Sequence, residues 1–585
     1  MKKLIIVFAV LMTTFGSCRE SIKNSSSSKG DMKFQQLSDE FLAGYLAWRP
    51  ELSVSLGFHE FDGKISDISK KSIVRELTRL KLFDQMLNEF DTASLSTGMH
   101  YDFSILQCGI KNELFNFEEI EPFTRNPMTY ASAMNVSIYI KRNFAPLEDR
   151  LKSIIAFEKN ASVIFEAAKS NLSDSLAKQY IETAILIANG SVDFLGNDLL
   201  IALKGVKNDS LMDEFKSANN KAISEVKAYV KYLKEEKLPK ANNKYALGRE
   251  KYRKMLLYGE DISMPSEKIL EIGLAELQKE KDVFNATAKI INPQKKSVEV
   301  YQNLQKEHPT SDSLLPTIKK NVEAIRQFLI DKKIVTIPSE ANVSVEATPK
   351  YARSTSTASM DSPGAFEKKA TEAYYYITPV DSMWTTKQKE DWLSMFDSYT
   401  SDLIAIHEVY PGHYIQFAHL NKSSATKIEK IFGSYAFIEG WAHYTEKMMI
   451  DEGYGTTGDP IKTAKYRLAQ SGEALLRLCR LCVSIKMHCE GMSVDDATKF
   501  FMDNWYQGEK PSRQEAIRGT FDPGYLYYTF GKLEMLKLRA DYKKQEGDNF
   551  TLKKFHDMVL ENGMPPIQIL REKMLLDKKI WTEIL

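Results

Sequence analysis

The chain has 585 residues, of which 43% are hydrophobic and 27% charged, a balance typical of a globular protein with a large core. Its length is compatible with two or three domains or with one large helical enzyme that has a central cleft. Because 79 Lys and Arg residues are matched by 78 Asp and Glu residues, the chain has no global positive field. We therefore expect no nucleic-acid partner.

The start of the chain predicts a secretory signal, because a basic head precedes an apolar run too short to span a bilayer. Small residues stand directly before Cys18, as in a bacterial lipobox. We expect a signal peptide over 1–17, lipidation of Cys18 and a polar tether over 18–32. The alternative is an ordinary signal peptide with an incidental cysteine.

The expected location is the bacterial cell envelope, in the periplasm or at the outer membrane. Contact with the membrane is expected through the lipid anchor only, because no later stretch looks long and apolar enough to cross a bilayer. The sequence does not predict an oligomeric state.

Residues 33–585 are expected to form one large, mainly helical catalytic domain. From 33 to 333, apolar residues recur at helical spacing, which predicts an N-terminal helical lobe. Between 334 and 380, β-branched and aromatic residues alternate with Pro, Ser and Gly, a texture that predicts a small sheet. Helical spacing returns over 387–585, which we interpret as the lobe that carries the metal site.

Two cysteines, Cys479 and Cys482, stand three residues apart in a strongly helical stretch. This spacing directs their side chains poorly for a disulfide. A zinc site with His488 and Cys489 would lack a second, distant pair of ligands. We interpret these cysteines as buried packing residues.

Five of the nine histidines fall between residues 407 and 488. The segment HEVYPGHYIQ resembles a zinc-protease helix, in which two histidines four residues apart flank a general-base glutamate. Here Glu408 follows His407 as that role demands, but His413 comes six residues after His407. On an unbroken helix a step of six would turn His413 to the far side.

Pro411 and Gly412 stand between these histidines and offer a solution to the spacing problem. Proline cannot continue a regular helix, and glycine tolerates unusual backbone angles. If two additional residues bulge out of the helix, His413 returns to the face of His407. The alternative is that one helix ends at Tyr410 and another begins at Pro411.

A second segment, EGWAHYTE, places Glu439, His443 and Glu446 on one face of a helix. We predict Glu439 as the third metal ligand. His443 and Glu446 are expected to hydrogen-bond the ligands or to orient the substrate. For Glu446, a solvated pair with the neighbouring Lys447 is the alternative.

Further along, YTFGKLEMLKLR places Tyr528 and Arg539 three helical turns apart on one stripe. Tyrosine can donate a hydrogen bond to an oxyanion, and arginine can pair with a carboxylate. Tyr525 and Tyr527 compete with Tyr528 for the tyrosine role. Aromatic stripes are more often part of a core, so this stretch is weak evidence alone.

The motifs HEVYPGH, EGWAHYTE and YTFGKLEMLKLR resemble the bacterial family named domain of unknown function 885, and the similarity extends over nearly all of the mature chain. Its members look like helical metallopeptidases of the gluzincin type. The resemblance implies a mainly helical fold with a small sheet near the metal-binding helices and a deep cleft. It also implies that His407, His413 and Glu439 bind one Zn²⁺ ion and that Glu408 is the general base.

The family pattern implies further that Tyr528, Arg539, Arg518 and His488 face the cleft. The segment before His488 departs from that pattern, since serine and lysine stand where an acid and a glycine are expected. This departure weakens the assignment of His488.

Together these features predict a zinc hydrolase that cleaves short peptides with Glu408, Tyr528 and His488 as catalytic residues. Arg518, Arg539 and Tyr525 are assigned to substrate binding. The strand AYYYITP is expected to bind an extended peptide at a sheet edge. One alternative is a non-catalytic lipoprotein that binds a peptide or a partner and holds a structural metal. The other is a metal-dependent hydrolase of another amide or ester.

Overall fold

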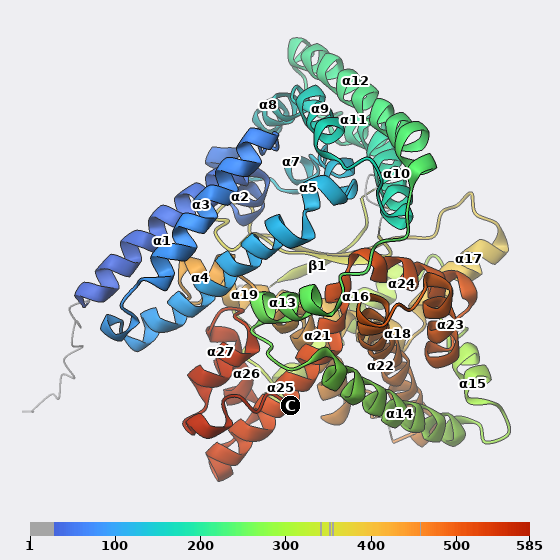
Figure 1. Cartoon of the computed structure of the whole chain (residues 1–585). Helices are drawn as coiled ribbons and strands as arrows, with labels where there is room; N and C mark the ends of the chain where they lie inside the picture. Colours follow the sequence, from blue (N-terminus) through green and yellow to red (C-terminus); the bar gives the residue numbers. More distant parts are fainter. Residues whose placement is uncertain (1–27, 340–341, 350–352, 354–355, 457) are drawn as a thin grey trace, which may run out of the picture.

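The computed structural model describes residues 28–339, 342–349, 353, 356–456 and 458–585. Cys18 and the predicted signal peptide lie outside these residues. Within them the protein is mainly helical with a small three-stranded sheet, as the sequence predicts (Figure 1).

The first half of the chain consists of helices that form two hydrophobic cores, one around α1, α3 and α4 and one around α6 to α12. These helices are α1 (Lys29–Trp48), α2 (Pro50–Leu56), α3 (Lys70–Asn88), α4 (Thr97–Phe115), α5 (Pro122–Arg125), α6 (Met128–Ala131), α7 (Ile138–Lys141), α8 (Leu147–Glu158), α9 (Ala161–Asn171), α10 (Lys178–Asp193), α11 (Leu199–Ala202) and α12 (Asp209–Tyr232).

Helix α1 begins inside the segment predicted as a polar tether. Ser28 caps it by accepting a hydrogen bond from the amide of Asp31, whose carboxylate in turn accepts from the amide of Ser28. This capping box satisfies amides that the first turn leaves without helical partners. The part of the predicted tether that follows Ser28 is therefore helical in the structure.

The stretch Lys178–Ala202, which contains α10 and α11, is long and apolar enough to cross a membrane by length and composition. This finding corrects the expectation that no stretch after the leader is long and apolar enough to cross a bilayer. The stretch nevertheless packs in the N-terminal region, where α10 contacts α6 and α12, and it also touches α24. Its apolar residues, including Ile181, Ala184 and Leu195, contribute to the core there.

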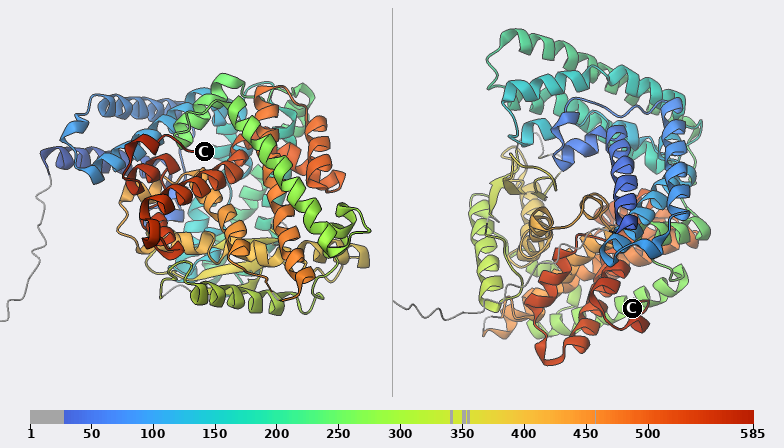
Figure 2. Two further views of the ribbon diagram at one scale, coloured as in Figure 1. Left: turned by 90° about the horizontal axis from the view of Figure 1, so that it is seen from below. Right: turned by 90° about the vertical axis from the view of Figure 1, so that its left-hand side faces the viewer.

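Apart from α20, whose Ile428 belongs to the core around α1, α3 and α4, the remaining helices share a third hydrophobic core, which includes α13 to α16 as well as the helices that follow the sheet. They are α13 (Arg249–Glu260), α14 (Ser266–Ile291), α15 (Ser297–Leu304), α16 (Leu314–Lys332), α17 (Thr386–Leu393), α18 (Thr400–Glu408), α19 (His413–Lys422), α20 (Lys427–Ile431), α21 (Tyr435–Asp451), α22 (Pro460–Cys489), α23 (Val494–Trp505), α24 (Glu509–Phe521), α25 (Tyr527–Glu546), α26 (Leu552–Glu561) and α27 (Ile567–Met574). In the right-hand view of Figure 2, the teal helices of the N-terminal half lie at the top and the red C-terminal helices at the bottom.

The sheet has the strand order β1 (Val343–Ala347), β3 (Ala373–Ile377), β2 (Ala358–Asp361). Strand β3 pairs with β1 in parallel and with β2 in antiparallel orientation. Its alternate residues Ala373, Tyr375 and Ile377 are buried in the third core. Because β3 is the central strand, its backbone is paired on both sides, and the expectation that AYYYITP offers a free edge to a peptide is wrong.

Helices α21 and α25 approach closely at two glycines. A Cβ atom on Gly531 would lie 2.0 Å from the carbonyl oxygen of Ala436, and one on Gly440 would lie 2.5 Å from the carbonyl carbon of Gly531. Only residues without a side chain allow this crossing. It brings the start of α25, with Tyr528, next to the segment of α21 that carries Glu439.

The cysteines of the helical stretch behave as predicted. Cys479 and Cys482 are fully buried in the third core, and both are free thiols.

Candidate metal centre

The two histidines of the first motif lie on α18 and α19, and the chain leaves helical geometry between them. The amide of Gly412 donates to the carbonyl oxygen of Ile406 at 3.0 Å, a bond that spans six residues where a regular helix spans four. The six-residue step is accommodated by two separate helices, because α18 ends at Glu408 and α19 begins at His413. This is the two-helix alternative, with ends two residues outside Tyr410 and Pro411, and the expected bulge within one continuous helix is not found.

The residues of this break are held tightly. A Cβ atom on Gly412 would lie 1.7 Å from the carbonyl oxygen of His407, so only glycine fits there. The indole of Trp441 donates a buried hydrogen bond of 2.9 Å to the carbonyl oxygen of Pro411. Because Trp441 stands two residues after Glu439 on α21, this bond ties the break to the helix of the third predicted ligand.

His407, His413 and Glu439 come together as the sequence predicts. Each offers a ligand atom, and the three atoms lie within 4.8 Å of one another. The Oε2 atom of Glu439 is 3.4 Å from Nε2 of His407 and 3.5 Å from Nε2 of His413. Donors about 2.0–2.1 Å from a tetrahedral zinc ion are roughly 3.3 Å apart, so this spacing fits a shared ion.

The surroundings of these atoms also fit a cation. The Oε2 atom of Glu439 is buried without a hydrogen-bond partner among the described residues, which is costly unless a positive group is bound there. Burial opposes ionisation, but the two imidazoles outweigh it and hold the pKa of Glu439 well below its usual range. The donor set of two imidazoles and one carboxylate is one that catalytic zinc uses.

Glu446 supports this group from the buried side. Its Oε1 atom is 2.7 Å from Nδ1 of His407 and 3.1 Å from Nη2 of Arg477, and its Oε2 atom is 3.1 Å from Nδ1 of His443. A proton on Nδ1 of His407 leaves the lone pair of Nε2 free for a metal ion. The alternative, a solvated pair with Lys447, is wrong, because Glu446 is buried and Lys447 pairs with Asp451.

On the other side of the group lies Tyr528. Its ring is nearly parallel to the ring of His407, with the centroids 6.4 Å apart. The guanidinium carbons of Arg480, Arg477 and Arg518 lie 5.1, 5.9 and 5.9 Å from the centroid of the Tyr528 ring. Three positive groups therefore surround a phenol that stands beside a predicted ligand.

Arg518 and Tyr435 lie with Tyr528 on the partly exposed side of the metal group, which we call the open side. Arg518 donates to the hydroxyl of Tyr435 at 3.4 Å and to the carboxylate of Asp522 at 2.9 Å. Tyr435 stands one helical turn before Glu439 on α21, and its ring is 5.9 Å from that of Tyr528. Sequence reasoning missed Tyr435, Arg477 and Arg480, although the spacing of four between Tyr435 and Glu439 was a usable signal.

Glu408 is the last residue of α18 and is partly exposed. The buried Tyr375 of strand β3 has a pKa raised well above its usual value, by burial first and by the negative charge of Glu408 second. The central strand therefore lies near Glu408, which agrees with the predicted position of the sheet beside the metal-binding helices.

Two of the expected cleft residues lie elsewhere. Both ring nitrogens of the buried His488 bond to the main chain, one to the amide of Leu247 and one to the carbonyl of Gly519. Arg539 contacts Tyr444 and Glu452. At a rise of 1.5 Å per residue, Glu452 lies about 20 Å further along the helix than Glu439. The structure does not bring either residue to the metal group.

Tyr525 lies close to Arg518 but is completely buried. Its hydroxyl has no hydrogen-bond partner among the described residues and rests against Gly519. Contact with a substrate would require this ring to leave the core, so Tyr528 is the better placed of the two.

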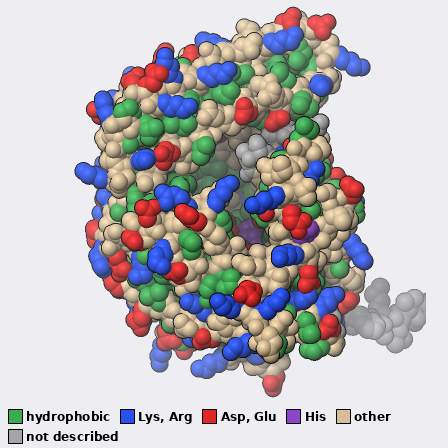
Figure 3. Space-filling view, turned by 90° about the vertical axis from the view of Figure 1, so that its right-hand side faces the viewer, with side chains coloured by type: hydrophobic (Ala, Val, Ile, Leu, Met, Phe, Trp, Pro, Cys, Tyr) green, Lys and Arg blue, Asp and Glu red, His purple; other side chains and the backbone are tan. Residues whose placement is uncertain are grey.

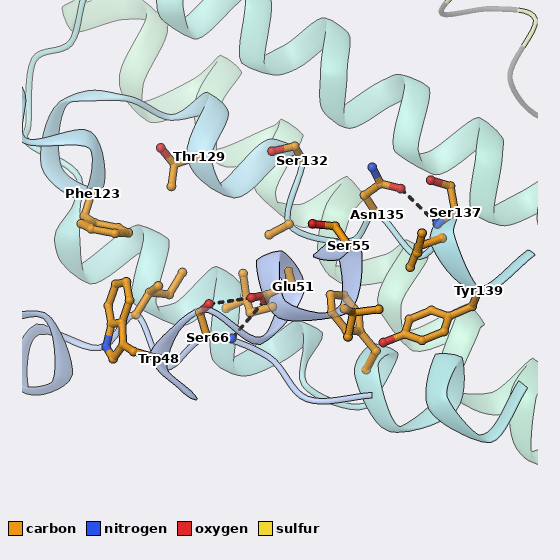
Figure 4. Close-up of a pocket in the computed structure, with 16 residues that line it drawn as sticks. Trp48, Glu51, Ser55, Ser66, Phe123, Thr129, Ser132, Asn135, Ser137 and Tyr139 are labelled. Carbon is orange, nitrogen blue, oxygen red and sulfur yellow. Dashed lines mark hydrogen bonds between the residues drawn. The ribbon is translucent and has the colours of Figure 1, made fainter. Parts of the chain in front are cut away.

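The surface is hollowed where histidine side chains are visible, with lysine and arginine around the opening (Figure 3). A separate cavity of about 420 Å³ lies among the N-terminal helices and shares no residue with the metal group (Figure 4). Trp48, Phe123 and Tyr139 line it together with several hydroxyl side chains, and Glu51 accepts hydrogen bonds from Ser66 inside it.

The family model described as "Bacterial protein of unknown function (DUF885)" matches residues 50–574. The chain belongs to this family. The match covers every residue of the metal group and its neighbours, and it confirms the resemblance seen in the motifs. A comparison with curated proteins found no match.

Two solved structures share the fold of this family member. One is titled a "putative lipoprotein of unknown function" from Shewanella oneidensis; it is 24% identical, with a TM-score of 0.76 over 92% of this chain and 99% of that chain. The other is titled "the putative lipoprotein from Colwellia psychrerythraea", at 18% identity and a TM-score of 0.74 over 94% of this chain and 99% of that chain. Most of the architecture is thus one that other proteins adopt.

Proposed function

We propose that this protein is a zinc-dependent hydrolase that cleaves short peptides, in the manner of a gluzincin-type metallopeptidase. The observation that carries the proposal is the meeting of His407, His413 and Glu439 within 4.8 Å, with Glu408 next to the first histidine. A structural zinc site is usually closed by a fourth protein ligand. The three-residue group beside the partly exposed carboxylate of Glu408 fits a catalytic site better.

A bound zinc ion supplies Lewis acidity, which polarises a carbonyl and lowers the pKa of water. The protein's part begins with its ligands: Glu446 holds His407 in the tautomer that presents Nε2, and Glu439 offers an unpaired oxygen. Glu408 then takes the proton from the attacking water and later gives it to the leaving amine. Its position at the end of α18 keeps it partly exposed, as this role requires.

Tyr528 is the proposed donor to the oxygen that gains negative charge in the transition state. Its ring lies against His407, and the positive charges of Arg477, Arg480 and Arg518 stand around it. Preorganised donors of this kind stabilise developing charge without moving during the reaction. We assign no catalytic step to His488 or Arg539.

The location of the protein follows from its leader. We propose that Cys18 is lipidated and that the protein works at the cell envelope, tethered by this lipid. The titles of the two structural neighbours, which both contain the word lipoprotein, support this proposal.

The test measures zinc content and peptide hydrolysis for the wild type and for Glu408→Gln. We expect about one zinc per chain in both proteins, and hydrolysis of peptides from a mixed library by the wild type only. Loss of general base catalysis typically reduces the rate by roughly 10²–10⁴-fold. Retained zinc with no hydrolysis of any peptide by the wild type would instead indicate a binding protein with a structural metal.

A further inference from the structure

The three arginines around Tyr528 differ in how accessible they are. The ion pairs of Arg477 with Glu473 and of Arg480 with Glu515 involve side chains that are 9–18% exposed. The pair of Arg518 with Asp522 is more open, with exposed fractions of 31% and 23%. Because partly exposed ion pairs are weak, Arg518 can exchange Asp522 for another carboxylate at little cost.

The position of Arg518 relates it to the metal group. Its guanidinium carbon lies 5.9 Å from the Tyr528 ring, which in turn lies 6.4 Å from the His407 ring. It also donates to Tyr435, one helical turn from Glu439. An extended peptide advances about 3.5 Å per residue, so this separation spans at most about three residues of substrate.

We infer that Arg518 anchors a carboxylate of the substrate, up to about three residues beyond the cleaved bond, and that the enzyme therefore prefers short peptides with a free carboxyl end. The planar guanidinium group holds a carboxylate through two parallel hydrogen bonds, which an amide cannot reproduce. Asp522 occupies this position in the free protein and competes with the substrate. The inference rests on the proposed function, because it places the anchored group relative to the cleaved bond.

The buried side of the metal group cannot serve this purpose. Glu446 and His443 are nearly inaccessible, and Arg477 is committed to Glu446 and Glu473. The side where Tyr435, Tyr528 and Arg518 are partly exposed is open to a substrate carboxylate.

The test measures peptide binding to zinc-loaded Glu408→Gln protein, so that no peptide is cleaved. Three tetrapeptides are compared: a free acid, the C-terminal amide of the same sequence, and an amide in which glutamate replaces the last residue. We expect the free acid to bind at least about tenfold more tightly than the plain amide, since a lost charge-assisted bidentate pair costs at least this much. The glutamate peptide shows whether a side-chain carboxylate is also accepted.

Matched variants assign the effect to Arg518. In the same background, Arg518→Gln should remove the preference for the free acid, and Asp522→Asn should strengthen it without changing the affinity for the amide. Arg518→Lys keeps the positive charge but cannot form two parallel hydrogen bonds with a carboxylate, so it should give an intermediate preference for the free acid. This variant also controls for misfolding. Arg513→Gln, an exposed arginine on the same helix, should leave the preference unchanged.

The outcomes separate this inference from the proposed function. Equal affinities for all three peptides, or a preference that survives Arg518→Gln, would overturn the anchor, even if the wild type hydrolyses peptides well. A clear preference for the free acid without any hydrolysis by the wild type would retain the carboxylate site and refute the peptidase.

Discussion

The two sides of the metal group are built differently. On one side, Glu446 and His443 are buried, and Glu446 is bonded to His443, to His407 and to Arg477. On the other side, Tyr435, Tyr528 and Arg518 are partly exposed and held by longer or more accessible contacts. The buried side is suited to fixing the ligands, and the open side is suited to meeting a substrate.

One helix, α21, contributes residues to both sides of the metal group. Tyr435, Glu439, His443 and Glu446 follow one another along α21 at steps of four, four and three. The first of them faces the open side, the second is the proposed ligand, and the last two lie in the core. Changes on the buried side should therefore alter metal binding, whereas changes on the open side should alter catalysis with the metal retained.

The largest effect on zinc binding and activity is expected for the proposed ligands, which lie between the buried side and the open side. His413→Ala removes one of the three donors, so we expect the protein to lose its zinc on dialysis and to lose peptide hydrolysis with it. Metal analysis by mass spectrometry and a hydrolysis assay check both. Unchanged zinc content in this variant would show that the ion binds elsewhere.

On the open side, Tyr528→Phe tests the proposed donor. We expect kcat to fall by roughly 10²-fold, in the range found when one oxyanion donor is removed, while the zinc affinity stays the same. Steady-state kinetics and a competition assay with a metal chelator separate the two quantities. A fall in zinc affinity as large as the fall in kcat would contradict the division into two sides.

On the buried side, Glu446→Gln keeps the shape of the side chain but removes its charge. We expect the zinc affinity to fall by about 10–100-fold, the usual effect of losing a group that orients a ligand, and activity to return when zinc is added in excess. Thermal unfolding without metal serves as the control for a general loss of stability. Activity that stays low at saturating zinc would place Glu446 in the reaction itself.

The smallest effect is expected for Arg539→Gln. Arg539 contacts Tyr444 and Glu452, away from the metal group, through bonds of 3.4 Å. We expect zinc affinity and kcat/KM to stay within about twofold of the wild type, because partly exposed ion pairs contribute little. A large loss of kcat/KM would mean that the substrate reaches further along α25 than this site suggests.

Local patterns in the sequence were sufficient for the helices, the sheet and the ligand group. The spacing of Glu439, His443 and Glu446 depends only on helix geometry, and the interruption of the helix at Pro411 and Gly412 follows from the backbone properties of those two residues. Each of these predictions concerns residues that are close in the chain or share a motif.

Long-range packing explains what the sequence did not reveal. A position on a helix does not say which neighbour that face meets, so His488 was assigned to the cleft although it bonds to Leu247 and Gly519. The same limit applies to strand β3, whose central place in the sheet depends on its pairing with β1 and β2. The role of Arg477 and Arg480 could not be predicted from the sequence, because it depends on their position near the Tyr528 ring in the folded protein.

The most direct test of the account is anomalous diffraction at the zinc absorption edge from crystals grown with zinc. The account predicts a single strong peak bonded to Nε2 of His407, Nε2 of His413 and the carboxylate of Glu439. An empty position between these three side chains, with zinc bound by other residues or not at all, would contradict it.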